Sequence, residues 1–283
     1  MKRLAEKNIN TPEWFNFVWS VENVHRYDAV RLRALLAGMD ETKSLLDVGA
    51  GWWGAAQYAV ANGYPGHYEA IDFSEEARRR TLEITPTLDY QIGDARAMTF
   101  ADGTFDIVSC GELIEHMESP AAFVAELVRV CKPGGKVIIG TLNDKCDAAI
   151  AHGEYPEHLW SFTPDDLVGF LTPYGSTTYW EVGHYHFVQC SKLPTPTGRW
   201  CDARTGKRDN PGNSYGDLWN RCTVTLDGSS IYDVFYFDQD NGIVGVYLRN
   251  EAGQFHSASP AGVAIEWKTG MVGIVTAESE AAR

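Results

Sequence analysis

Gly49, Gly51 and Asp72 have the spacing of a glycine-rich turn followed by an acidic residue that could hold a nucleotide. Glycine readily adopts positive φ and lets a ligand approach the backbone closely. Asp72 follows Gly51 by 21 residues (72 minus 51), and a carboxylate near that position accepts hydrogen bonds from ribose hydroxyls in nucleotide-binding units. We therefore expect a nucleoside-containing ligand here. The alternative role for Asp72 is to cap the next helix, which Ser74 could do equally well.

Further polar residues follow the next strands along the chain. Gly93-Asp94-Ala95 follows a short β-prone run, and the Asp94 carboxylate is suited to accept a hydrogen bond from an adenine amino group. Gly111-Glu112-Leu113-Ile114-Glu115-His116 follows the run after that. Open α/β sheets bind ligands at the carboxyl ends of their strands. These groups therefore mark a candidate site at one edge of a sheet.

The elements that must position these residues alternate between strand and helix. Helices are expected at 24–39, at about 54–62, from 75 and at about 120–131, and apolar strands at 44–48, 67–72, 89–92, 105–110 and 136–142. This alternation predicts an α/β fold with a parallel sheet and helices on both faces.

The pattern changes after Leu142. Thr163, followed by Pro164 and two aspartates, is typical of a helix start, and this helix is expected to run to about Leu171. The β-prone runs 177–182 and 185–191 predict a hairpin that closes one edge of the sheet.

The C-terminal residues show no helical periodicity. Short β-prone runs at 222–226, 231–237, 243–248, 263–267 and 271–275 are separated by turn signals. We therefore expect four parts, namely an N-terminal helical cover or lid at 1–40, an α/β domain at 41–192, a Pro- and Thr-rich linker at 193–198, and a small β-rich accessory domain at 199–283.

Composition narrows the classes of partner. The net charge of -14 disfavours nucleic acid, whose phosphates require basic grooves. The six cysteines form no C-x-x-C pair and the first residues form no apolar signal, which indicates a reducing, cytoplasmic location. No apolar run approaches the roughly 20 residues that span a bilayer. We expect a soluble protein without a membrane partner.

The motifs together resemble those of class I S-adenosylmethionine-dependent methyltransferases over about residues 25–192. Leu46-Asp47-Val48-Gly49-Ala50-Gly51 is similar to the first motif of that family, and Cys131-Lys132-Pro133-Gly134-Gly135-Lys136 to the loop before its fifth strand. The resemblance implies a Rossmann-like, seven-stranded sheet and S-adenosylmethionine as the cofactor. It implies a cofactor site made by Asp47, Gly49, Ala50, Gly51, Asp72, Phe73, Asp94, Ala95, Gly111 and Glu112.

Within that family, Glu112-Leu113-Ile114-Glu115-His116 is similar to O-methyltransferases of the ubiquinone-biosynthesis type and related small-molecule enzymes. The resemblance implies that Glu112, Glu115 and His116 hold a divalent cation such as Mg²⁺, which lowers the pKa of the acceptor hydroxyl. Alternatively, His116 is the general base and Glu115 its catalytic neighbour, without a metal. A third interpretation is that Glu115 and His116 only position the next helix. Residues 158–163 resemble the family segment that lines the acceptor site.

We therefore expect methyl transfer to a small-molecule acceptor, with a hydroxyl oxygen favoured. The spacing of Gly49, Gly51 and Gly54 also fits an NAD-dependent oxidoreductase. A second alternative is a non-catalytic S-adenosylmethionine-binding or scaffold protein, because Trp52 and Trp53 crowd the glycine turn. The sequence after the fourth strand lacks the N-P-P-Y and D-P-P-Y motifs of enzymes that methylate amino groups of bases.

The sequence allows more than one role for two further regions. The aromatic segment from Trp14 to Trp19 is either a lid over the site or an ordinary packed cover. The C-terminal region loosely resembles small β-rich proteins encoded by bacteriophages. It either forms a homodimer, recruits a protein partner, or serves as a stabilising cap.

Overall fold

The computed structural model describes residues 1–21, 29–143 and 156–194, together with 200–202, 207–208, 222–227, 229–231, 234–238, 241, 243–247, 257–259, 262–263, 265–269 and 272–276. The chain divides into two compact units, Met1–Lys192 and Leu193–Arg283.

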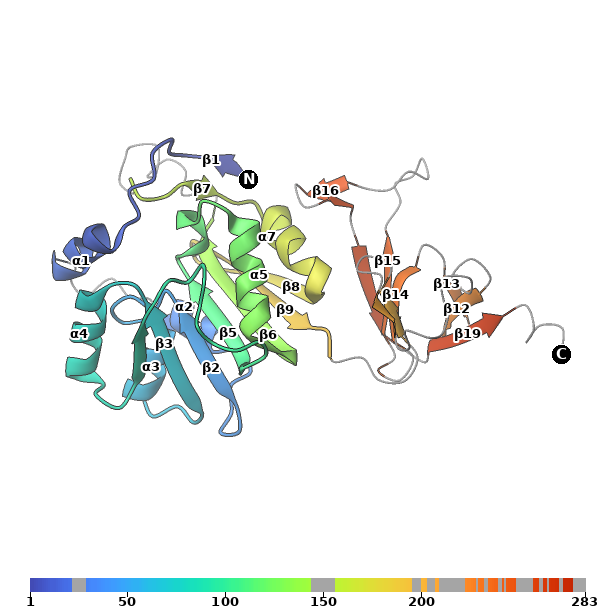
Figure 1. Ribbon diagram of the computed structural model, residues 1–283, viewed down its shortest axis with the longest axis horizontal. Helices are drawn as coiled ribbons and strands as arrows, with labels where there is room; N and C mark the ends of the chain where they lie inside the picture. Colours follow the sequence, from blue (N-terminus) through green and yellow to red (C-terminus); the bar gives the residue numbers. More distant parts are fainter. Residues whose placement is uncertain are drawn as a thin grey trace. The chain divides into compact units, whose positions relative to one another are not determined.

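A seven-stranded sheet forms the centre of the first unit (Figure 1). In spatial order its strands are β4 (Asp89–Ile92), β3 (His67–Asp72), β2 (Ser44–Val48), β5 (Phe105–Gly111), β6 (Cys131–Leu142), β9 (Tyr185–Lys192) and β8 (Gly175–Val182). Neighbouring strands are parallel except β9, which runs antiparallel to both β6 and β8. The strand order reverses between β2 and β5, where open α/β sheets form a ligand crevice at their carboxyl ends.

Helices cover both faces of this sheet. The helices of the first unit are α1 (Pro12–Val21), α2 (Ala29–Leu35), α3 (Ala55–Ala61), α4 (Glu75–Ile84), α5 (Pro120–Val130) and α7 (Pro164–Leu171), with short 3₁₀ turns η2 (Ile114–His116) and η4 (Thr172–Tyr174). Successive strand residues point to opposite faces. Leu45 accordingly packs in the cluster that includes α2 and α3, and Leu46 in the cluster that includes α5 and α7.

The structure confirms the predicted fold class, and many boundaries agree. The ranges predicted for β2, β3 and β4 coincide with the observed strands, and β8 and β9 form the predicted hairpin. Thr163 caps α7 through a capping box with Asp166. The prediction was wrong for β6, which begins at Cys131 rather than at Lys136. Cys131 already pairs with Phe105, and an irregularity in register precedes the pairing of Lys136 with Ile107.

The N-terminal segment differs more from the prediction. Of the helix predicted at 24–39, the structure has α2 at Ala29–Leu35, and Gly38 follows with a φ of 87°. Residues 22–28 lie outside the described part of the chain. Two strands of the first unit were not predicted, namely β1 (Lys2–Arg3) and its antiparallel partner β7 (Trp160–Ser161). This pairing joins the start of the chain to the segment that precedes α7.

The second unit consists, in its described part, of short strands in three sheets. The first sheet contains β11 (Lys207–Arg208), β10 (Trp200–Asp202), β14 (Val234–Asp238), β15 (Ile243–Tyr247) and β18 (Ile265–Thr269). The second sheet contains β13 (Ser229–Ile231), β12 (Cys222–Leu226) and β19 (Val272–Thr276). The third sheet contains β16 (Ser257–Ser259) and β17 (Gly262–Val263).

The predicted strand 231–237 is divided between two of these sheets, because Ile231 pairs with Val224 whereas Val234 pairs with Val246. The predicted strand 263–267 is divided in the same way between β17 and β18. Residues 195–199 of the predicted linker and its flank lie outside the described residues. No helix in the described ranges is long and apolar enough to cross a membrane.

Candidate active site

The turn after β2 requires glycine for two reasons. Gly49 and Gly51 have φ values of 67° and 55°, in the left-handed region that side chains disfavour. A Cβ on Gly51 would also overlap the indole of Trp19. Gly54 has a different role, because a Cβ there would lie 2.5 Å from the Asp47 carboxylate. Gly54 is therefore required because only a residue without a side chain fits between the turn and the Asp47 carboxylate, directly before α3.

Asp72 stabilises the same turn through hydrogen bonds to the backbone. Its carboxylate accepts hydrogen bonds from the backbone N–H groups of Gly51 at 3.0 Å and Ser74 at 2.8 Å. The side chain is buried, and burial raises the pKa of Asp72 to about 6. The cap of α4 is Ser74, whose hydroxyl accepts a hydrogen bond from Ala77 N–H. Asp72 thus orders the glycine turn and lies at the pocket wall, and it does not cap the helix.

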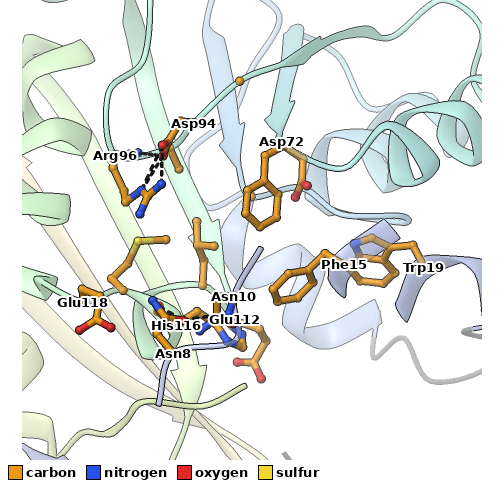
Figure 2. Close-up of a pocket in the computed structure, with 16 residues that line it drawn as sticks. Asn8, Asn10, Phe15, Trp19, Asp72, Asp94, Arg96, Glu112, His116 and Glu118 are labelled. Atoms are coloured by element: carbon orange, nitrogen blue, oxygen red, sulfur yellow. Dashed lines mark hydrogen bonds and ion pairs between the residues drawn. The ribbon is translucent and has the colours of Figure 1, made fainter. Parts of the chain in front are cut away.

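One pocket lies at the carboxyl edge of β2, β3, β4 and β5 (Figure 2). The predicted site residues that line it are Gly49, Asp72, Phe73, Asp94, Ala95, Glu112 and His116. The remaining lining residues are Asn8, Asn10, Phe15, Trp19, Gly93, Arg96, Leu113, Met117 and Glu118. The predicted site residues that do not line the pocket are Asp47, Ala50, Gly51, Gly111 and Glu115.

Asp47 acts on the neighbouring helix and not at the pocket wall. Its buried carboxylate accepts a hydrogen bond from Ala56 N–H at 2.9 Å, in the first turn of α3. A carboxylate is favourable there because the first N–H groups of a helix have no partner within the helix. Asp47 therefore fixes where α3 begins.

Asp94 lies on the rim of the pocket with Arg96 (Figure 2). The guanidinium of Arg96 donates to both carboxylate oxygens of Asp94, at 2.7 to 3.1 Å, and this lowers the pKa of Asp94. An ionised carboxylate has about four lone-pair sites, so Asp94 keeps acceptor capacity for a further donor. The ion pair holds this carboxylate in its ionised form at the rim.

Two glutamates follow β5, namely the half-buried Glu112 directly after the strand and the buried Glu115 in η2. Glu112 has a φ of 56°, and its buried Oε1 has no hydrogen-bond partner among the described residues. Burial raises the pKa of Glu112 well above its usual value and that of Glu115 to about 7. Arg31, on α2, lowers the pKa of both carboxyls through its charge. Unusual backbone geometry and unsatisfied buried groups concentrate at functional sites.

His116 is a neutral imidazole in a fixed orientation. Its Nδ1 lies 3.1 Å from the carbonyl oxygen of Glu157. A carbonyl only accepts, so Nδ1 carries the hydrogen and Nε2 has the lone pair. Burial lowers the pKa of His116 to about 4, and hydrogen bonds to the backbone of Glu157 and of Glu112 act in the opposite direction. Asn10 Nδ2 donates to the same Glu157 carbonyl at 3.0 Å and so ties the N-terminal segment to this histidine.

The grouping of possible metal ligands differs from the expected one. Ligand atoms of Glu115, His116 and His158 lie within 4.8 Å of one another, and Glu112 is not in this group. The two imidazole rings meet edge to face, 4.9 Å between centroids. Mg²⁺ prefers oxygen ligands, whereas two imidazoles and one carboxylate suit a transition metal. The residues present do not fit the predicted Mg²⁺ site.

Trp52 and Trp53 do not crowd the pocket. The Trp52 side chain is buried beneath the guanidinium of Arg80. The backbone N–H of Trp53 donates a hydrogen bond to Gln57 Oε1 at 2.7 Å. Neither tryptophan is among the pocket residues, whereas Phe15 and Trp19 of α1 are (Figure 2). The crowding by Trp52 and Trp53 that favoured a non-catalytic scaffold is therefore not seen in the structure.

Three functional candidates were missed in the sequence. Arg31 and Asn10 reach the site from segments with no motif, and residues 158–163 were expected near the acceptor without a role for His158 itself. The signal for Arg31 is weak, because it is one of several arginines near the predicted helix 24–39. Only the folded arrangement brings these side chains together.

Comparisons with known proteins agree with this geometry. Residues 46–139 match the family model described as a methyltransferase domain. The chain is 34% identical over 173 residues to the ubiquinone biosynthesis O-methyltransferase of Thiobacillus denitrificans, covering 56% of this chain and 72% of that protein. It is 34% identical over 141 residues to the 2-methyl-6-phytyl-1,4-hydroquinone methyltransferase of Synechocystis, covering 48% of this chain and 42% of the length of that relative.

The fold is also found in solved structures. A SAM-dependent methyltransferase of Thermotoga maritima superposes with a TM-score of 0.51 at 15% identity, over 64% of this chain and 97% of that chain. This likeness concerns the fold alone. The family match and the relatives replace the oxidoreductase alternative that the spacing of Gly54 left open. The chain belongs to the class I S-adenosylmethionine-dependent methyltransferases, and it is an enzyme.

Proposed function

We propose that this enzyme methylates a hydroxyl oxygen of a small-molecule acceptor. The observation that carries this proposal is His116, a neutral imidazole at the pocket wall whose Nδ1 is fixed by Glu157 and whose Nε2 keeps its lone pair. Methylation of a hydroxyl requires removal of its proton, and a positioned imidazole can accept it. The relatives named as O-methyltransferases support the same choice.

The cofactor half would be held by groups that are already ordered. Asp72 would accept hydrogen bonds from the ribose hydroxyls, and Asp94, on the rim, one from the adenine amino group. Arg31 has a buried Nε without a partner among the described residues, and it would receive the carboxylate of the amino-acid end. S-adenosylmethionine supplies an activated methyl group on a positively charged sulfur.

His116 and its surroundings would handle the proton. Nε2 takes the hydroxyl proton while the Glu157 carbonyl holds Nδ1–H, so the ring keeps its orientation as it becomes positively charged. Glu115 lies in the same buried group and would stabilise that charge. Phe15 contacts the His116 ring edge-on, 5.5 Å between centroids, and would exclude water from this side.

The experiment that tests this proposal uses matched acceptors. Purified enzyme and cofactor with a ¹³C-labelled methyl group are offered a hydroquinone, the same ring with both oxygens blocked, and the corresponding aromatic amine. The proposal predicts label on oxygen of the hydroquinone and no transfer to the blocked ring. Label on ring carbon or on nitrogen would contradict it.

His116→Asn is the matching variant. The Asn amide can still donate to the Glu157 carbonyl, but it has no basic nitrogen. We expect kcat to fall by about 100-fold or more, as is typical for loss of a general base, with the cofactor dissociation constant within about twofold. Full activity of this variant would remove His116 from the reaction.

A further inference from the structure

Helix α1 closes the pocket with two aromatic side chains. Phe15 packs against Phe73, 5.5 Å between centroids, and against His116. Trp19 lies on Gly51, where a Cβ would overlap its indole ring. Figure 2 shows both side chains at the pocket. The helix therefore contacts the glycine turn at one point and the proposed base at another.

This helix is only partly packed against the rest of its unit. Trp14, Phe15, Val18 and Trp19 are half-buried, none of the residues of α1 is fully buried, and Phe17 and Val21 are 58% and 66% exposed. A buried apolar face normally fixes a surface helix in place. Polar contacts with the neighbouring helix α4 therefore add to the aromatic contacts that hold α1 in position.

Two polar side chains make those contacts. Asn16 Oδ1 accepts hydrogen bonds from the Ser74 hydroxyl at 2.7 Å and from Glu76 N–H at 3.2 Å, at the start of α4. Arg80, one turn further along α4, donates to the carbonyl of Trp19. That carbonyl lies in the last turn of α1, where helix carbonyls lack intrahelical partners and a cation is favourable.

Arg80 also contacts the residue that follows the glycines of the turn, Trp52. Its guanidinium carbon lies 3.3 Å from the centroid of the Trp52 ring, a cation–π contact on a side chain that is 4% exposed. Trp52 directly follows Gly51 in the sequence. A ligand bound at the turn therefore lies next to the surface on which Arg80 stacks, and through Arg80 it is linked to the end of α1.

We propose that Asn16 and Arg80, with Trp52 as the platform for Arg80, are positioning residues that latch α1 over the pocket and couple its closure to cofactor binding. This inference rests on the function proposed above for the identity of the ligand, and it assigns the tryptophan of the glycine turn a role. A closed lid excludes water and retains the cofactor during methyl transfer. Because the coupling is reciprocal, loosening the latch also weakens cofactor binding.

Hydrogen exchange of the full chain, with and without saturating S-adenosylhomocysteine, measures the latch directly. In the wild-type protein, ligand should slow amide exchange in residues 12–21. In Arg80→Ala, exchange in this segment should be about tenfold faster in both states, and the dissociation constant from calorimetry should rise about tenfold. Exchange in β2 should not change, which separates a local effect from a loss of fold.

Arg79→Ala is the matched control, because it removes the same charge from the neighbouring position of α4. The described contacts of Arg79 are with Glu76 and Glu83, on the same helix. This variant should exchange like the wild-type protein. Trp52→Phe, which keeps a ring under Arg80, should remain near wild type, whereas Trp52→Leu should behave like Arg80→Ala. Rescue by the aromatic substitution is not expected from a residue that only fills space.

The two proposals fail in different ways. If wild-type protein binds no S-adenosylhomocysteine, the function proposed above falls, and the exchange of the unliganded protein still tests the latch. If ligand binds but Arg80→Ala and Arg79→Ala give the same exchange in residues 12–21, the latch is overturned. Should Arg80→Ala fail to fold, Asn16→Ala and Trp52→Leu carry the same comparison.

Discussion

The half of the pocket that we propose for the cofactor and the half that we propose for the acceptor differ in how completely their carboxylates are paired. In the cofactor half, Asp72 accepts hydrogen bonds from Gly51 and Ser74, and Asp94 pairs with Arg96. Toward the proposed acceptor half, Glu112, which the resemblance assigns both to the cofactor site and to the metal site, has a buried Oε1 without a partner among the described residues. Residues that bind the same cofactor in every turnover can form their hydrogen bonds before the cofactor arrives. Residues that take a proton from the acceptor must keep hydrogen-bond acceptor atoms unpaired for it.

The pKa values follow the same division. The ion pair with Arg96 lowers the pKa of Asp94, whereas burial raises that of Glu115 to about 7 and lowers that of His116 to about 4. The acceptor half therefore presents an uncharged imidazole near neutral pH. Shifted carboxyl and imidazole groups in one pocket are typical of proton-transfer sites.

The largest effect expected in the cofactor half is that of Asp72→Asn. The amide can no longer accept from both buried N–H groups and from ribose hydroxyls, and hydrogen bonds to a charged group contribute about 1.5–3 kcal/mol. We expect the cofactor dissociation constant from calorimetry to rise about 100-fold. Asp94→Asn is the control at the exposed rim, and its effect should stay below about fivefold. Equal effects of the two variants would remove the distinction between buried and rim carboxylates.

Arg31→Gln tests which half this arginine serves. Its charge lowers the pKa of Asp47, Glu112 and Glu115, and its buried Nε has no partner among the described residues, although Arg31 is not among the residues that line the pocket. If it receives the cofactor carboxylate, the dissociation constant should rise about 30-fold, because a charge-assisted pair is lost. A normal affinity with a slow methyl-transfer step would instead assign Arg31 to the acceptor half.

Cofactor affinity should also depend on pH through Asp72. Its pKa is raised to about 6 by burial, so the carboxylate is ionised at pH 7.5 and mostly protonated at pH 5. If only the ionised form accepts from the ribose, linkage predicts about a tenfold rise in the dissociation constant between these two pH values. Asp72→Asn should abolish this dependence, although Asp47 titrates in the same range. A slope that survives in the variant would place the titrating group elsewhere.

The smallest effect is expected from removal of metal ions. The group formed by Glu115, His116 and His158 does not have the oxygen ligands that Mg²⁺ prefers. Treatment with EDTA followed by addition of Mg²⁺ should therefore change kcat by less than about twofold. A loss of activity that Mg²⁺ restores would show that the acceptor half is completed by that ion.

The sequence was most informative where a function resides in adjacent residues. β2, β3 and β4 were predicted to the residue, because a strand and its turn are local features. The spacing between Gly51 and Asp72 led us to expect the two residues together, and the Asp72 carboxylate accepts a hydrogen bond from Gly51 N–H. β6 was misplaced because its first residue pairs before the Gly134-Gly135 loop, which reads locally as a turn.

The acceptor half was less predictable because it is assembled over long distances. The imidazole of His116 is oriented by Glu157, which Asn10 also contacts from the start of the chain. The role of α1 could not be derived either, since it depends on Arg80 and Trp52 meeting across two elements. No periodicity or motif spacing encodes contacts of this kind.

Single-turnover methyl transfer at saturating cofactor tests the division between the halves most directly, because saturation removes differences in binding. With the acceptor identified by isotope transfer, His116→Asn should react about 100-fold more slowly than wild type, and Asp72→Asn within about threefold of it. The contradictory result is a wild-type rate in His116→Asn, or an equally large loss in Asp72→Asn once its cofactor site is saturated.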